Sequence, residues 1–221
     1  MEKLCETELC TGCGACASIC PNGCISMKPD DEGFFRPSID VVNCNECNLC
    51  GKTCPILSKQ SIENNETIAY AAINIDEKIR YNSTSGGIFS LLCQWVLDKD
   101  GIVFGASYNE DFNVVHCQVD DIQDLYKLRG AKYAQSNLDD TFKLVQAYLD
   151  KGKYVLFSGT PCQVGGLKAF LGKEYDNLLL VDLICHGVPS PQIWQKYIEY
   201  RANIDSNGTK PSEINLRSKE T

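Results

Sequence analysis

The sequence predicts an α+β protein, in which a small cysteine-rich module precedes a larger domain with a mixed, mostly parallel sheet. Eight of the 14 cysteines lie in two matched runs near the N-terminus. A polar segment follows them and suggests a linker. After it, apolar runs of strand length alternate with apolar residues at helical spacing, which indicates an α/β domain. We therefore expect a module over 1–58, a linker over 59–67 and an α/β domain over 68–221.

Each cysteine run reads C-x2-C-x2-C-x3-C-P, and the two are offset by 34 residues throughout. Two-cluster bacterial ferredoxins have this spacing, and the fourth cysteine of each run there ligates the other cluster. A zinc site needs only four cysteines, and with no signal peptide recognised, a disulfide framework is not expected. We predict two [4Fe–4S] clusters. The first is assigned to Cys10, Cys13, Cys16 and Cys54, and the second to Cys20, Cys44, Cys47 and Cys50.

Composition argues against several classes of protein. The 221 residues are 43% hydrophobic and 23% charged, with a net charge of −8. No apolar run reaches about 18 residues, so we expect no membrane insertion. No basic stripe is present, which argues against nucleic acid as a partner. A cysteine-rich chain without an export signal is expected in the reducing cytoplasm.

Periodicity gives the elements expected in the second domain. Strands are predicted over 68–73, 102–106, 114–119, 154–157 and 178–184. Helices are predicted over 87–97, 138–149, 164–171 and 194–198. The nearly continuous apolar run over 178–184 is typical of a strand buried on both faces. A further strand is predicted to begin over 214–217, and because domains rarely end by opening a strand, we expect the chain to be a fragment.

Two turns in the second domain carry residue types that suit a cofactor. Ser85-Gly86-Gly87 precedes the first long helix, and is either a phosphate cradle or a plain helix cap. Gly159-Thr160-Pro161-Cys162-Gln163 joins a strand to a helix, with Thr160 as N-cap and Gln163 placed for a capping box. Cys162 then lies in the first turn, where the helix dipole favours a thiolate. It is a redox thiol, a cluster ligand or a cofactor contact, or else a small buried residue.

Two further segments are candidates. Cys185-His186-Gly187 follows the strand predicted over 178–184, and ligands of α/β sheets bind outside the carboxyl ends of strands. Cys162 and Cys185 are therefore expected to face one crevice, although a lone histidine such as His186 is usually structural. Lys132 and Tyr133 supply a cation and a ring, or belong to an ordinary surface loop.

The remaining cysteines have no partner spacing. We expect Cys93 to be a core residue, because it lies on the amphipathic helix over 87–97. Cys24 is interpreted as a spare thiol near the first cluster. No role is assigned to either of them.

Four segments together make the chain resemble the family of coenzyme F420 hydrogenase/dehydrogenase beta subunits, in the form that carries an N-terminal two-cluster ferredoxin module. The segments are Ser83–Gly87, Gly130–Ser136, Leu156–Gln163 and Asp182–Pro191. The resemblance implies a flavin, FAD or FMN, beside the two clusters. It makes the glycine-rich loop, Lys132 and the Gly159–Gln163 turn candidates for the flavin site, and Cys162 and Cys185 candidates for flavin contact or a further cluster.

The resulting hypothesis is an oxidoreductase that passes electrons between [4Fe–4S] clusters and a flavin. Coenzyme F420 or another low-potential compound would be donor or acceptor, and a redox partner protein or a soluble electron carrier would exchange electrons with the clusters. One alternative is a ferredoxin-type carrier fused to a docking domain without a flavin. The other is a non-redox transferase or binding module in which the clusters only stabilise the fold.

Overall fold

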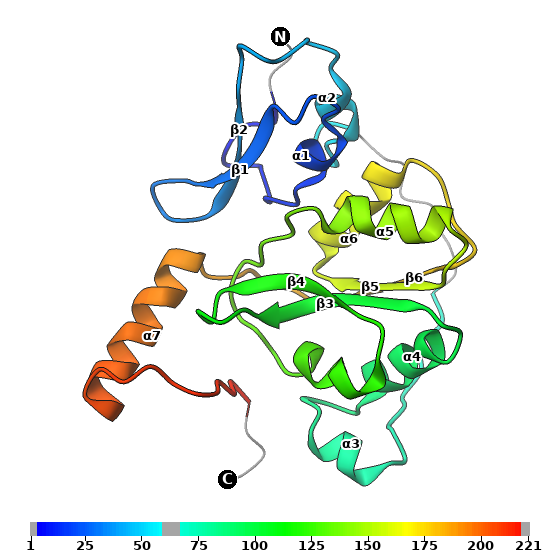
Figure 1. The fold of residues 1–221 in the computed structure, drawn as a ribbon, viewed down its shortest axis with the longest axis vertical. Coiled ribbons are helices and arrows are strands. Elements are labelled where there is room, and N and C mark those ends of the chain that lie inside the picture. Colours follow the sequence, from blue (N-terminus) through cyan, green and yellow to red (C-terminus); the bar gives the residue numbers. More distant parts are fainter. Residues whose placement is uncertain (1–3, 59–66, 218–221) are drawn as a thin grey trace.

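The computed structural model describes residues 4–58 and 67–217 (Figure 1). The cysteine-rich module consists of four short elements: α1 (Ala15–Ile19), β1 (Ile25–Pro29), β2 (Phe35–Ile39) and α2 (Leu49–Thr53). The two strands form an antiparallel hairpin in which Ile25 pairs with Ile39. Asp30 and Gly33 close its turn, because the Asp30 N–H donates to the Phe34 carbonyl and Gly33 has φ of +83°. Helices α1 and α2 are offset by the same 34 residues as the cysteines.

The second part of the chain is built on a four-stranded sheet in the order β4-β3-β5-β6. Strands β3, β5 and β6 are parallel and β4 is antiparallel to β3, so the sheet is mixed and mostly parallel, as predicted. The elements are α3 (Glu77–Tyr81), α4 (Ile88–Leu97), β3 (Ile102–Tyr108), β4 (Val114–Val119), the 3₁₀ helix η1 (Ile122–Leu128), α5 (Thr141–Asp150), β5 (Val155–Gly159), α6 (Pro161–Leu171), β6 (Leu178–Asp182) and α7 (Pro191–Ser206).

Alternation along the strands places two apolar layers on the sheet. On one face, Phe104 and Phe157 pack with Phe142 of α5 and Leu167 of α6. On the other face, Val103, Val119 and Leu156 pack with Cys93 and Val96 of α4 and with Leu125 of η1. Cys93 is fully buried, which confirms the prediction that it is a core residue.

The cysteine-rich module lies against the α5 and α6 layer (Figure 1). Ala15 of α1 is fully buried and belongs to the same apolar cluster as Phe142 and Leu167. Gln135 forms a second link between the two parts. Its Oε1 accepts from the Phe35 N–H at 2.7 Å, and its Nε2 donates to the Phe35 carbonyl at 3.3 Å. The module is therefore held both by apolar packing and by a side chain that bonds strand β2 of the hairpin.

Several predicted elements differ from the structure. Residues 68–73 are not a strand, and most of this segment is exposed, so its apolar residues do not pack into the sheet. Strand β6 ends at Asp182 and is an edge strand, and Leu183 and Ile184 are exposed, so the expectation of burial on both faces was wrong. Residues 214–217 form no strand; Ile214 and Leu216 pack instead against the cluster around Trp194.

The predicted linker over 59–67 lies outside the described residues except for its last position. Among the helices of the described chain, none combines the length and the apolar character needed to cross a bilayer.

Gln135→Ala tests the link between the two parts. The Phe35 N–H and C=O would lose their partners in a site where Gln135 is buried, so we expect a loss of about 1–3 kcal/mol of unfolding free energy. Anaerobic urea unfolding measures this value. Gln123→Ala is the matched control, because the Gln123 side chain is exposed on η1 and its loss is expected to leave stability unchanged. Equal stability of the two variants would contradict the assignment.

Candidate functional site

One cavity in the cysteine-rich module is lined by Cys10, Cys13, Cys16 and Cys54. The chain turns these thiols inward through two glycines with left-handed backbone, Gly12 at φ +68° and Gly14 at φ +78°. Met27 and Pro37, which pair across the hairpin, form an apolar wall. Burial raises the pKa of Cys16 to about 12. This thiol therefore stays protonated until a metal displaces its proton.

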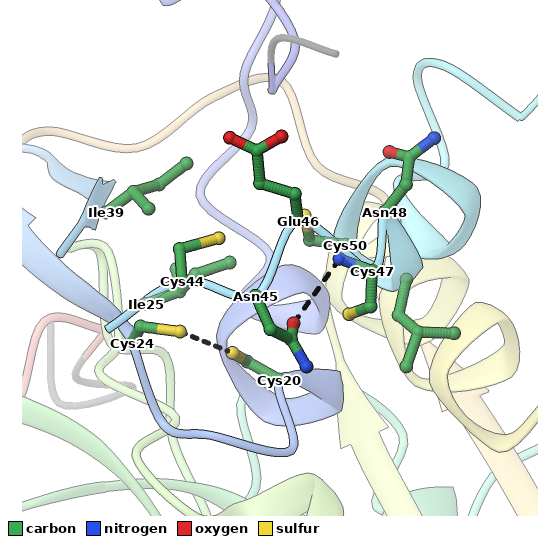
Figure 2. A pocket seen from close by; sticks show the side chains of 11 residues that line it. Cys20, Cys24, Ile25, Ile39, Cys44, Asn45, Glu46, Cys47, Asn48 and Cys50 are labelled. Carbon is green, nitrogen blue, oxygen red and sulfur yellow. Dashed lines mark hydrogen bonds between the residues drawn. The ribbon is translucent and has the colours of Figure 1, made fainter. Parts of the chain in front are cut away.

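A second cavity is lined by Cys20, Cys44, Cys47 and Cys50 (Figure 2). Its loop repeats the backbone of the first. Glu46 at φ +55° and Asn48 at φ +58° stand 34 residues after the two glycines and adopt the same left-handed conformation. Asn tolerates this region well, whereas Glu does so at a cost. The Cys47 N–H donates to Asn45 Oδ1 at 3.3 Å and tightens the turn.

The donor sets fit the predicted clusters. Each cavity contains three cysteines of one run and the fourth cysteine of the other, which is the crossed arrangement of two-cluster ferredoxins. Four cysteine thiolates are the usual ligand set of a [4Fe–4S] cluster. Over residues 4–58 and 67–217, no three His, Cys, Asp or Glu side chains are grouped as ligands of a single metal ion.

Each cavity also has a fifth cysteine that lies outside the two runs. Cys5 lines the first cavity, and burial together with the neighbouring Cys10 and Cys54 raises its pKa to about 12. Cys24 lines the second cavity, with its Sγ 3.4 Å from Cys20 Sγ. The hydrogen bond with Cys20 raises the pKa of Cys24 to about 11. The expectation that Cys24 lies near the first cluster was wrong, because Cys20 itself lines the second cavity.

The first cavity abuts helix α6 of the α/β domain. A Cβ added at Gly166 would lie 3.0 Å from Cys13 Cβ and 3.1 Å from Cys13 Sγ, closer than side-chain atoms normally approach. Cys162 stands four residues earlier, about one helical turn from Gly166. Its Sγ lies 3.1 Å from Thr160 Oγ1. Cys13, a predicted ligand of the first cluster, and the candidate Cys162 are therefore carried by surfaces in direct contact.

The candidates Gly159–Gln163 and Cys185–Gly187 share the carboxyl edge of the sheet. They follow β5 and β6, which are adjacent and parallel, and the Leu183 N–H donates to the Gly159 carbonyl at 3.0 Å. Cys185 and His186 are exposed, whereas Cys162 is partly buried. The structure thus brings both segments to one edge of the sheet, while the crevice expected between Cys162 and Cys185 stays a prediction.

Gln163 is part of a polar network that sequence reasoning did not identify. Its Oε1 accepts from the Thr160 N–H at 3.0 Å, which confirms its place in the predicted capping box, and its Nε2 donates to Ser136 Oγ at 2.7 Å. Ser136 Oγ lies 3.0 Å from His116 Nδ1, and His116 Nε2 lies 3.1 Å from the Ser158 carbonyl. Both ends of the Gln163 amide are thus engaged within the protein. The position of His116 in the middle of a strand carried no sequence signal for this role.

The N-terminus of α4 lies after the glycine-rich loop. Gly87 at φ +77° is its N-cap, and no side chain caps the helix there. Gly86 packs closely on the Ala72 carbonyl, where a Cβ would lie 3.0 Å away. In the first turn, Ser90 Oγ accepts from Arg129 Nε at 3.1 Å. Arg129 thus adds a cation next to free helix amides, a setting that suits an anion. Nothing in the sequence around Arg129 indicated this contact.

Lys132 and Tyr133 differ in their surroundings. Lys132 Nζ donates to the Arg129 carbonyl at 2.7 Å and lies 5.8 Å from the centre of the Tyr108 ring. Burial lowers the pKa of Lys132 to about 8. Tyr133 is 46% exposed, so it is available at the surface.

Two family matches cover the two parts of the chain. Residues 9–56 match the 4Fe-4S dicluster domain. Residues 152–219 match the C terminus of the coenzyme F420 hydrogenase/dehydrogenase beta subunit. The first match confirms the prediction that the module belongs to the class that holds 4Fe–4S clusters.

The curated relatives point the same way. The F subunit of the F(420)H(2) dehydrogenase of Methanosarcina mazei is 22% identical over 195 residues, 84% of this chain and 55% of that protein. The coenzyme F420-dependent sulfite reductase of Methanocaldococcus jannaschii is 28% identical over 181 residues, 76% of this chain and 26% of that protein. An uncharacterised ferredoxin of the latter organism is 34% identical over 55 residues, 25% of this chain and 70% of the ferredoxin. The chain thus spans about half or less of the two longer relatives.

A solved structure of the F420-reducing [NiFe] hydrogenase complex from Methanosarcina barkeri contains a chain with similar structure. The TM-score is 0.49 at 24% identity, and the match covers 65% of this chain and 53% of that one.

His116→Gln tests the polar network through pH. Desolvation lowers the pKa of His116 from about 6.5 to about 4, so the folded protein binds fewer protons than the unfolded chain between these values. The contribution of neutral His116 to the unfolding free energy is fully present above pH 6.5. It is lost as the pH decreases toward 4, by up to roughly 3 kcal/mol. Urea unfolding at pH 7.5 and pH 5 is expected to show a smaller pH dependence for the variant. The same pH dependence in both proteins would argue against a neutral His116.

Proposed function

Because the chain belongs to the family of coenzyme F420 hydrogenase/dehydrogenase beta subunits and carries a 4Fe–4S dicluster domain, we propose that it transfers electrons between a redox partner and a flavin site in its α/β domain. Coenzyme F420 is the proposed donor or acceptor at that site, since two relatives are named for it. Another low-potential compound is the alternative. One relative is named as part of a multi-subunit dehydrogenase, which supports a protein as the redox partner.

The contact between Cys13 and Gly166 carries this proposal. A pure carrier fused to a docking domain has no need to place a cluster ligand against the helix that starts the candidate site. Here Cys13 packs on α6, and that helix begins at the Thr160–Cys162 turn on the carboxyl edge of the sheet. The first cluster site is therefore the inner one, next to the α/β domain.

The second cluster site is proposed as the outer one. Its Cys47 is exposed, whereas the four run cysteines of the first cavity are partly or fully buried. Leu49 on the same wall is 39% exposed and the nearby Val42 is 88% exposed. Apolar side chains next to an exposed cluster ligand suit the approach of a partner protein.

The residues at the α4 N-terminus fit the phosphate-bearing end of a flavin nucleotide. The uncapped amides after Gly87 and the guanidinium of Arg129 would hold the phosphates. Ser85 and Gly86 precede these amides, and Lys132, which bonds the Arg129 carbonyl, adds a second cation near Arg129. Cys162, Cys185, His186 and Gly187 would border the ring, and a further cluster on Cys162 and Cys185 is the other use of these thiols.

A bound flavin would convert the two-electron transfer of a hydride into single-electron steps. Bound [4Fe–4S] clusters would accept or give those electrons one at a time. The residues of the chain itself fix the position of the candidate site. The capping box of Thr160 and Gln163 fixes the start of α6, and the network through Ser136 and His116 holds that start against β4 and β5.

The proposal is tested by the iron, sulfide and flavin contents of anaerobically purified protein. We expect two clusters, about eight iron atoms, and a flavin released on denaturation. Clusters without any flavin would instead support the ferredoxin-type carrier. Unimpaired catalysis after loss of a cluster in Cys13→Ala would support clusters that only stabilise the fold.

Arg129→Gln tests the flavin site. Removal of a charged hydrogen-bond donor costs about 1.5–3 kcal/mol, so flavin affinity should fall tenfold or more while iron content is unchanged. Flavin fluorescence after release measures occupancy. Arg201→Gln is the control, because that arginine pairs with Asp205 on the exposed side of α7. Full flavin occupancy in Arg129→Gln would remove the α4 N-terminus from the site.

Gly166→Ala tests the contact with the inner cluster. The added methyl group overlaps Cys13, so we expect about 1–3 kcal/mol of destabilisation and slower reduction of the clusters by reduced flavin in stopped flow. Gly165→Ala is a matched control on the same helix, since no atom lies within 4 Å of its added Cβ. It should be neutral or stabilising by about 0.5–1 kcal/mol. Equal electron-transfer rates in both variants would place the route elsewhere.

A further inference from the structure

The second cavity contains one cysteine more than a cluster needs. A [4Fe–4S] cluster takes four cysteine ligands, and five line this cavity: Cys20, Cys24, Cys44, Cys47 and Cys50. The 34-residue repeat assigns four of them and leaves Cys24. The position that corresponds to it in the second repeat is Ser58, whose hydroxyl donates to the Cys54 carbonyl at 2.8 Å and contributes no sulfur. The repeat therefore does not explain Cys24.

The geometry ties Cys24 to one ligand. Its Sγ lies 3.4 Å from Cys20 Sγ, and the two sulfurs point toward each other in Figure 2. The two cysteines are not bonded to each other. A tight turn fixes their approach, because the Gly23 N–H donates to the Cys20 carbonyl at 3.2 Å. The Cys24 carbonyl is anchored in turn by the Asp40 N–H at 2.8 Å.

The Cys24 thiol lies in buried, largely apolar surroundings. The residue is only 7% exposed, and Ile25 and Ile39 lie beside it on the cavity wall. In such an apolar setting a hydrogen bond is stronger than at the surface. When Cys20 binds iron it is a thiolate without a proton. The thiol of Cys24 is then the only one of the two that carries a proton, so Cys24 is the hydrogen-bond donor and Cys20 the acceptor.

We propose that Cys24 is a positioning residue that tunes the second cluster, by donating an S–H···S hydrogen bond to the ligand Cys20. Hydrogen bonds to the sulfurs of an iron–sulfur cluster are among the factors that set its reduction potential. The reduced cluster carries one more negative charge than the oxidised cluster, so a donor stabilises the reduced form more. Cys24 therefore raises the potential of the outer cluster. The inference rests on the clusters and requires nothing of the flavin site.

The test is a potentiometric titration of the holoprotein followed by EPR, with Cys24→Ala and Cys24→Ser. In Cys24→Ala, one of the two cluster potentials should fall. The ratio of reduced to oxidised cluster at a fixed potential should decrease about three- to tenfold, where tenfold is ~59 mV for one electron. The other potential serves as an internal reference and should not move. Cys24→Ser keeps a hydrogen-bond donor, so its cluster potential should stay close to that of the unaltered protein.

Cys93→Ala is the control, because it removes a buried thiol from α4, far from both cavities, and should change neither potential. Iron content decides the remaining outcomes. Unchanged potentials in Cys24→Ala with full iron content would overturn the proposal. So would an equal shift in Cys24→Ser, which would make the effect one of packing. Loss of half the iron in both Cys24 variants would show that Cys24 is a ligand and would equally overturn it.

Discussion

The packing of Cys13 on Gly166 is the contact on which the arrangement of the two parts depends. A side chain at position 166 would meet Cys13 at 3.0 Å and push α1 away from α6. Ala15 would then leave the apolar cluster in which it is fully buried. Glycine inside a helix costs about 0.5–1 kcal/mol relative to alanine. Burial of Ala15 and the close approach of the first cavity offset this cost at Gly166, whereas nothing in the structure explains Gly165.

The segment before α5 links the module to the edge of the sheet. Gln135 bonds the hairpin through Phe35 and bonds the loop after β6 through the Pro189 carbonyl, at 3.1 Å from its own N–H. The next residue, Ser136, bonds Gln163 and His116 on the other side. Two adjacent residues thus connect the cluster-bearing hairpin, the turn before α6 and the loop that carries Cys185.

The features that depend on residues close together in the sequence were predicted correctly. The spacing of the cysteines predicted the two sets that line the cavities, and Thr160, Pro161 and Gln163 predicted the start of α6. What the sequence could not show depends on tertiary neighbours. The run over 178–184 reads as buried, but β6 is an edge strand, so Leu183 and Ile184 are exposed. Arg129, His116 and the docking role of Gly166 depend on partners 20 to 153 residues away in the chain. The glycine pair at 165 and 166 does not indicate, from the sequence alone, which segment packs against it.

The two halves of the module show how one repeated backbone acquires two roles. Helices α1 and α2, and the left-handed residues before them, correspond position by position. Their surroundings do not. Ala15 is fully buried against the α/β domain, while its counterpart Leu49 is 39% exposed. Because the repeat gives both cavities the same cysteine spacing and the same left-handed turns, the two cavities differ mainly in what lies around them. Helix α6 lies against the first cavity, whereas the second is exposed to solvent at Cys47. The two cavities are therefore distinguished by their neighbours, and not by the spacing of their cysteines.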